Sequence, residues 1–285
     1  MSLRTQEILC IGTFAILILF AQSSMAQAHP GIFPKGDKPR GLLLFFLTFA
    51  AIYLTLVIHE AGHLITGLVQ GFRFELFVVG FLGIKRSKQS IRFFFNKNLG
   101  YMGGIAATVP VRQDPANRRK FAWVLAAGPL ASILFSIGSF GFFSYSGSGA
   151  ARAFWLITAA TSAGIFLVTT IPYRTGMFFT DRARFQRLMS KGPTGAAEEA
   201  LLIIIAQNVQ DNSSKNIPLE KARLLQNDTE KLMRFWGFYY EYYYYLQNEM
   251  LNEATDAKNR LYAVKEYVPA AVWKSLGIES ATEAR

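Results

Sequence analysis

Two histidines and a glutamate form an H-E-x-x-H motif, His59-Glu60-Ala61-Gly62-His63, inside an apolar run of the chain. On a helix, residues four apart share one face, so both imidazoles can bind the same metal ion. Glu60 can then hold a metal-bound water as a general base, which is the arrangement of a zinc hydrolase. The other interpretation is a pair of core histidines beside a chance glutamate, but buried ionisable residues in a membrane are costly and usually functional.

The composition indicates an integral membrane protein. Of 285 residues, 51% are hydrophobic and only 17% are charged, and the apolar residues occur in blocks. The net charge of +11 is concentrated in residues 71–120, which hold ten Lys or Arg and two acidic residues. A basic block between apolar spans is typical of a cytoplasmic loop, so we expect no nucleic-acid partner. The single cysteine, Cys10, excludes an internal disulfide.

Four apolar segments can be placed along the chain. Residues 1–28 resemble a cleavable signal peptide, but they could equally form a short first transmembrane helix. The rest of the 1–40 region is expected to be a loop on the outer side of the membrane. Three membrane spans are predicted at 41–71, 121–143 and 151–171, which leaves the C-terminus in the cytoplasm. The motif would therefore lie within the membrane, near its cytoplasmic face.

Two regions differ from these spans. Residues 72–113 alternate aromatic, branched and basic residues, which predicts amphipathic β-hairpins at the membrane interface, or else a plain connector with snorkelling arginines. Residues 191–285 are predicted to form a cytoplasmic helical tail. It is either a small cap that packs its own aromatic residues or a tetratricopeptide-like groove that binds a protein partner.

A catalytic zinc ion normally has a third protein ligand, and Asp181 is the best candidate by position. It follows the last span on the side of the membrane where His63 lies, whereas His29 is on the other side. Glu75 and Asp114 belong to the interfacial region. Thr180-Asp181 could also simply cap the helix that follows and runs to about Met189.

These motifs resemble the site-2 protease family of intramembrane zinc metalloproteases over roughly residues 41–190. The resemblance implies zinc bound by His59, His63 and Asp181, with Glu60 as the catalytic base. It also implies a substrate-positioning role for the Gly-Pro-x-x-Asn segment of the family, to which Gly128, Pro129 and Ser132 correspond in this chain. Two positions depart from the family pattern: serine replaces the asparagine at 132, and Arg182 replaces a glycine after the aspartate.

The expected architecture is an α-helical polytopic membrane protein. It has an N-terminal apolar segment (1–40), a three-helix metalloprotease core (41–190) with its interfacial β-hairpin region, and a C-terminal helical tail (191–285). The expected function is zinc-dependent hydrolysis of a peptide bond in a transmembrane protein substrate within the lipid bilayer. Membrane di-iron oxygenases need more than the three histidines present. The alternative is a catalytically silent metal-binding scaffold that acts through its tail.

Overall fold

The computed structural model describes the chain in four stretches, residues 41–87, 90–147, 149–175 and 178–278. The predicted signal peptide or first transmembrane helix lies outside these residues. The described chain divides into two compact units, each described by itself. The first unit comprises 41–70, 74–108 and 123–184, and the second comprises 71–73, 109–122 and 185–278. The chain enters the second unit for the last time at residue 185, and the predicted domain boundary is at residue 190.

The first unit is built from long helices and short strands. In chain order these are α2 (Gly41–Val69), β1 (Arg73–Val79), β2 (Leu82–Ser87), β3 (Ser90–Phe95), η1 (Leu99–Tyr101), β4 (Ile105–Val109), α3 (Asn117–Tyr145), α4 (Gly149–Thr170), β5 (Arg174–Thr175), β6 (Phe178–Phe179) and α5 (Asp181–Met189). Helix α3 begins in the second unit and continues in the first, while α5 begins in the first unit and ends in the second.

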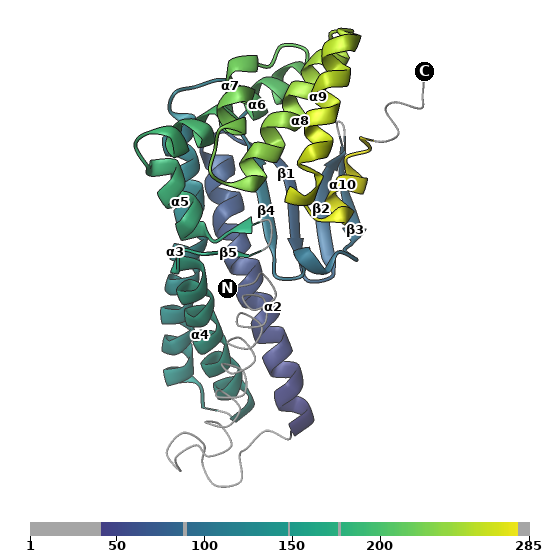
Figure 1. The fold of residues 1–285 in the computed structure, drawn as a ribbon. Coiled ribbons are helices and arrows are strands. Elements are labelled where there is room, and N and C mark those ends of the chain that lie inside the picture. The colour runs from purple at the N-terminus through teal and green to yellow at the C-terminus, as the bar shows by residue number, and fades with distance from the viewer. Residues whose placement is uncertain (1–40, 88–89, 148, 176–177, 279–285) are drawn as a thin grey trace. The chain divides into compact units, whose positions relative to one another are not determined.

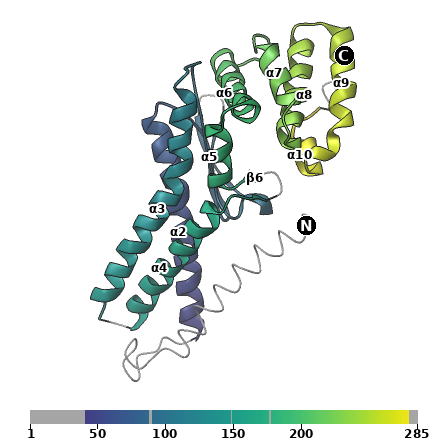
Figure 2. The same cartoon turned by 60° about the vertical axis from the view of Figure 1, so that its left-hand side comes forward.

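Helices α2, α3 and α4 are each long and apolar enough to cross a membrane, and they lie side by side (Figure 1, Figure 2). Their outward faces carry large apolar side chains. On α2, for example, Leu42 is 71% exposed and Phe45 is 60% exposed. Such faces are unfavourable in water and suited to lipid. The three predicted spans are therefore confirmed as long apolar helices of an integral membrane protein.

Small and hydroxyl-bearing residues lie where these helices pack together. Gly62 of α2 packs so closely on α3 that a Cβ added to it would lie 2.6 Å from the Ala127 carbonyl oxygen. The Ser162 hydroxyl of α4 donates a hydrogen bond to the Ser132 carbonyl of α3 at 2.7 Å. Close backbone approach and interhelical hydrogen bonds are the interactions that hold helices together in lipid.

A four-stranded sheet occupies most of the predicted hairpin region, with strand order β3-β2-β1-β4. Strands β1, β2 and β3 form an antiparallel meander, with Phe77 opposite Ile84 and Ile84 opposite Phe93. The turn after β1 contacts α2, because a Cβ at Gly80 would lie 3.1 Å from the Tyr53 ring. Strand β4 is an edge strand, and Thr108 on it packs directly against Gly67 of α2.

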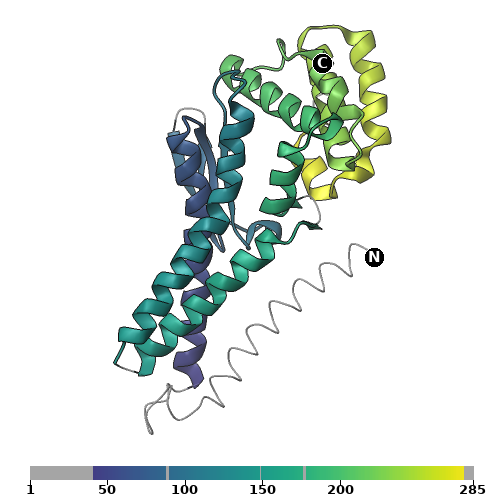
Figure 3. The same cartoon turned by 90° about the vertical axis from the view of Figure 1, so that its left-hand side faces the viewer.

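The second unit contains the helical C-terminal segment (Figure 3). Its further elements are α6 (Pro193–Asp211), α7 (Leu219–Gln226), α8 (Lys231–Gln247), α9 (Leu251–Ala263), η2 (Lys265–Tyr267) and α10 (Ala270–Ser275). The core of this unit consists of buried side chains from α6, the segment before α7, α7 and α8, with partly buried aromatic residues of α8 packed against it.

One buried arginine links three elements of the second unit. Arg187 in α5 forms ion pairs at 2.8 Å with Glu198 of α6 and with Asp228, which precedes α8. The two carboxylate side chains are 2% and 0% exposed. Buried charges are tolerated when they are paired in this way, and loss of one partner is destabilising, so Arg187 is expected to contribute to the packing of this unit.

Candidate metal centre

Three side chains from two distant parts of the sequence converge in the first unit. The Nε2 atoms of His59 and His63 lie 3.3 Å apart. Asp181 approaches both of them, with Oδ2 3.3 Å from the His59 Nε2 and Oδ1 3.3 Å from the His63 Nε2. Both histidines are buried and the Asp181 side chain is only 18% exposed. Each residue thus directs one possible ligand atom to a shared point.

Each imidazole is oriented through its other nitrogen by helix α3. His63 Nδ1 lies 2.7 Å from the Val124 carbonyl oxygen, which can only accept, so Nδ1 carries the proton and donates it. This tautomer leaves the His63 Nε2 lone pair free to bind a metal. His59 Nδ1 forms a 2.9 Å hydrogen bond with the Ser132 hydroxyl. Such outer partners fix the rotation of the rings that bind a metal.

Helix α3 approaches His63 at Gly128, which is followed by Pro129. A Cβ at Gly128 would overlap His63 Nε2, so only glycine leaves room for the ring at this position. Pro129 lies inside α3 and has no N–H, so it cannot donate to the carbonyl one turn earlier and it disturbs that turn. The Val124 carbonyl that accepts from His63 belongs to this same region of the helix.

Glu60 lies beside the ligand cluster and is itself buried, with 8% exposure. Its carboxylate interacts electrostatically with His59, His63 and Asp181, and it hydrogen-bonds to the backbone of Ala106 in β4. Gly104 has a positive φ of 107°, and a Cβ there would collide with the Glu60 carboxylate. Strand β4 and the glycine just before it therefore hold the Glu60 carboxylate in place.

Asp181 is the first residue of α5. The Thr180 hydroxyl, rather than the Asp181 carboxylate, accepts the hydrogen bond from the Ala183 N–H and so caps the helix. Burial raises the pKa of the Asp181 carboxyl, but contacts with His59 and His63 outweigh burial and hold this pKa below its usual range. Asp181 is therefore a carboxylate at neutral pH, as a metal ligand must be.

The donor set fits zinc. With Zn–N and Zn–O bonds of about 2.0–2.1 Å, the ligand atoms of a tetrahedral site are about 3.3 Å apart. The two Nε2 atoms have this separation, each imidazole lies 3.3 Å from a different oxygen of Asp181, and one ligand atom from each residue can be chosen so that all lie within 4.8 Å of one another. The Asp181 Oδ2 atom is also buried and makes no hydrogen bond besides its 3.3 Å approach to His59 Nε2, so a bound cation would balance its charge. Two imidazoles and one carboxylate leave a fourth position for water or substrate.

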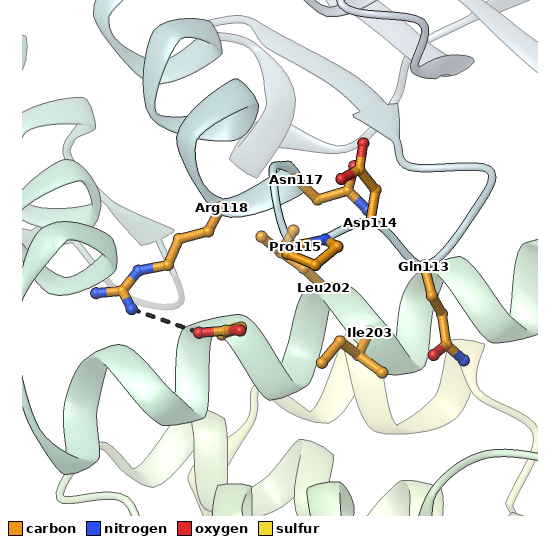
Figure 4. Close-up of a pocket in the computed structure, with 8 residues that line it drawn as sticks. Gln113, Asp114, Pro115, Asn117, Arg118, Leu202 and Ile203 are labelled. Carbon is orange, nitrogen blue, oxygen red and sulfur yellow. Dashed lines mark hydrogen bonds and ion pairs between the residues drawn. The ribbon is translucent and has the colours of Figure 1, made fainter.

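A separate recess in the second unit is lined by α6 and the segment before α3 (Figure 4). It encloses about 260 Å³. Its charged side chains are already paired: Arg118 with Glu199 at 3.4 Å, and Asp114 with Lys120 at 2.7 Å. No histidine contributes to this lining, so the recess offers no comparable set of metal ligands.

The sequence-predicted residues fall into two groups by their contacts. The structure brings His59, His63, Asp181 and Glu60 together, and their roles as metal ligands and catalytic base stay predictions. The three residues expected to position substrate lie on α3, where Gly128 and Ser132 contact the histidines themselves. Their proposed role toward substrate stays a prediction.

Two contributors were not foreseen. These are the Val124 carbonyl and the Gly104–Ala106 segment. Both act through the main chain, which leaves no signature in residue type. Arg182, one of the two departures from the family pattern, is exposed.

Three helices long and apolar enough to cross a membrane, with two histidines and an aspartate that could hold a metal ion, are the features of a membrane metalloprotein. The chain belongs to peptidase family M50, the site-2 protease family, whose model matches residues 47–271. The match includes most of the C-terminal helices as well as the core. Membership implies an intramembrane metallopeptidase. Comparison with curated proteins and comparison with solved structures each find no match.

Proposed function

We propose that this protein is a zinc-dependent endopeptidase that cuts a peptide bond in or near a transmembrane segment of another protein. The observation that carries this proposal is the convergence of His59, His63 and Asp181, whose possible ligand atoms lie within 4.8 Å of one another, with Glu60 beside them. Family membership supports the peptidase activity. Zinc itself is proposed from the donor set and its spacing.

Bound zinc would supply Lewis acidity, which polarises a carbonyl group and lowers the pKa of water toward neutrality. Glu60 takes a proton from the attacking water and delivers it to the departing amine nitrogen. The water oxygen bonds to the carbonyl carbon, the C–N bond breaks, and the products are a carboxylate and an amine. Ser132 and the Val124 carbonyl keep the two imidazoles oriented throughout.

The sheet is suited to hold the substrate. A helix in lipid hides its peptide groups in its own hydrogen bonds, so the segment to be cut must unwind. Strand β4 is an edge strand, and its Ala106 hydrogen-bonds to Glu60, so this edge lies beside the catalytic carboxylate. An extended substrate can pair with such an edge through main-chain hydrogen bonds.

The sheet also enters the membrane more deeply than an interfacial hairpin would. The turn at Gly80 contacts Tyr53, which precedes His59 by six residues, or about 9 Å of helix. Exposed apolar side chains around this turn, Phe81 at 47% and Leu82 at 61%, suit hydrocarbon. We place the metal centre toward the cytoplasmic face, with the C-terminus in the cytoplasm, because the basic surplus follows α2.

The test compares wild type with Glu60→Gln. As a general base, Glu60 acts on water rather than on the metal, so the variant should retain zinc and lose proteolysis. The readouts are metal content of purified protein and mass spectrometry of new peptide termini in membranes from cells that express each form. Peptide termini that are unchanged in Glu60→Gln would show that the protein is not a protease. A scaffold would instead lose its function when the chain is cut after Met189.

A further inference from the structure

Thr180 occupies the junction from which the third ligand projects. Its hydroxyl donates a hydrogen bond to the Ile171 carbonyl at 2.8 Å, just beyond the end of α4. The same oxygen accepts from the Tyr173 N–H at 3.2 Å and from the Ala183 N–H at 3.4 Å. One side-chain atom thus joins the end of α4, the start of the β5–β6 hairpin and the first turn of α5.

The main chain of Thr180 reinforces this junction. Its N–H donates to the Tyr173 carbonyl at 3.0 Å, and its carbonyl accepts from the Arg184 N–H at 3.0 Å. The first of these bonds extends the ladder in which Arg174 pairs with Phe179. The direction in which α5 leaves the hairpin is therefore fixed at this residue, immediately before Asp181.

The carboxylate that follows has little else to orient it. His59 is oriented by Ser132 and His63 by the Val124 carbonyl, but the Asp181 Oδ2 makes no hydrogen bond besides its approach to His59 Nε2. Its position beside the two imidazoles depends on where the main chain begins α5. A hydroxyl is required for this, because a single atom must both donate and accept, whereas valine has the same shape and can do neither.

We propose that Thr180 is the positioning residue for Asp181, which sets the third ligand at its distance from both histidines. This inference rests on the proposed function, in which Asp181 binds the metal. Outer residues that orient ligands typically change metal affinity by about 10–100-fold. Thr180 acts through the main chain, so we expect an effect of about tenfold, at the lower end of that range.

The experiment titrates purified full-length protein in detergent with Co²⁺, whose visible absorption bands report both occupancy and coordination geometry. Thr180→Val should need about tenfold more free Co²⁺ for half occupancy and should show altered bands. Thr180→Ser retains the hydroxyl and should match wild type. Thr48→Val is the matched control, because it removes a buried hydroxyl of α2 that bonds only within its own helix, to the Leu44 carbonyl at 2.8 Å.

Two further variants separate the possible failures. Asp181→Ala should lose most of the Co²⁺ affinity; if it binds like wild type, the ligand set of the proposed function is wrong. If Asp181→Ala loses Co²⁺ while Thr180→Val keeps wild-type affinity and bands, only the role of Thr180 is overturned. Thr180→Asn, which can still cap α5, serves if the valine variant does not fold. Wild-type binding by the asparagine variant would equally overturn the inference.

Discussion

The substitution Gly128→Ala tests the close packing of α3 on the second histidine. A Cβ at this position would overlap His63 Nε2, whereas an ordinary contact requires at least 3.4 Å. Either the imidazole or the helix must move by about 1 Å to restore that separation. A zinc–nitrogen bond is only about 2.0–2.1 Å long, so such a shift breaks the bond or forces the other ligands to follow.

The expected result is a large loss of function with modest loss of stability. A misplacement of about 1 Å at a catalytic site can cost about 100-fold in rate, and overpacking typically costs about 1–3 kcal/mol. Metal content, peptide cleavage and thermal unfolding of the purified protein measure the three effects separately. The matched control is Gly138→Ala in the same helix, because a Cβ there meets nothing within 4 Å.

The two glycine variants should differ sharply. Gly138→Ala should keep wild-type metal content and activity, since alanine is also the better helix former. If Gly128→Ala retained full zinc and cleavage while Gly138→Ala behaved as expected, the position of His63 against α3 would be wrong. A loss in both variants would point instead to a general intolerance of α3 to substitution.

Three other changes have defined outcomes. Ser132→Ala removes the hydroxyl partner of His59 Nδ1 and should weaken zinc binding about tenfold, measured by competition with a chelator; undiminished affinity would exclude an orienting role. Arg187→Gln removes the charged partner of two buried carboxylates and should destabilise the second unit by about 3–5 kcal/mol in chemical unfolding, whereas the exposed Arg182→Gln should have little effect. Reporter fusions after Ser146 and at the C-terminal end should report opposite sides of the membrane, and the same side for both would mean that a span is miscounted.

The sequence alone determined the features that depend on local periodicity. Two histidines four residues apart share a helix face whatever the rest of the fold does, so His59 and His63 were predictable as partners. The apolar blocks likewise predicted α2, α3 and α4, since a span in lipid must satisfy its backbone within a helix. The basic surplus between α2 and α3 predicted orientation but not structure.

Only the tertiary structure decided the contacts between segments far apart in the chain. Ser132 is 73 residues from His59 and the Val124 carbonyl is 61 residues from His63, and neither distance in sequence predicts a contact. Glycine at 62 and at 128 could equally have indicated flexibility, yet each is required by close packing between α2 and α3. The strand order that brings β4, rather than β3, beside Glu60 also follows from sheet topology. Residue type specifies what a side chain can bind, but the packing of helices and strands determines which groups it meets.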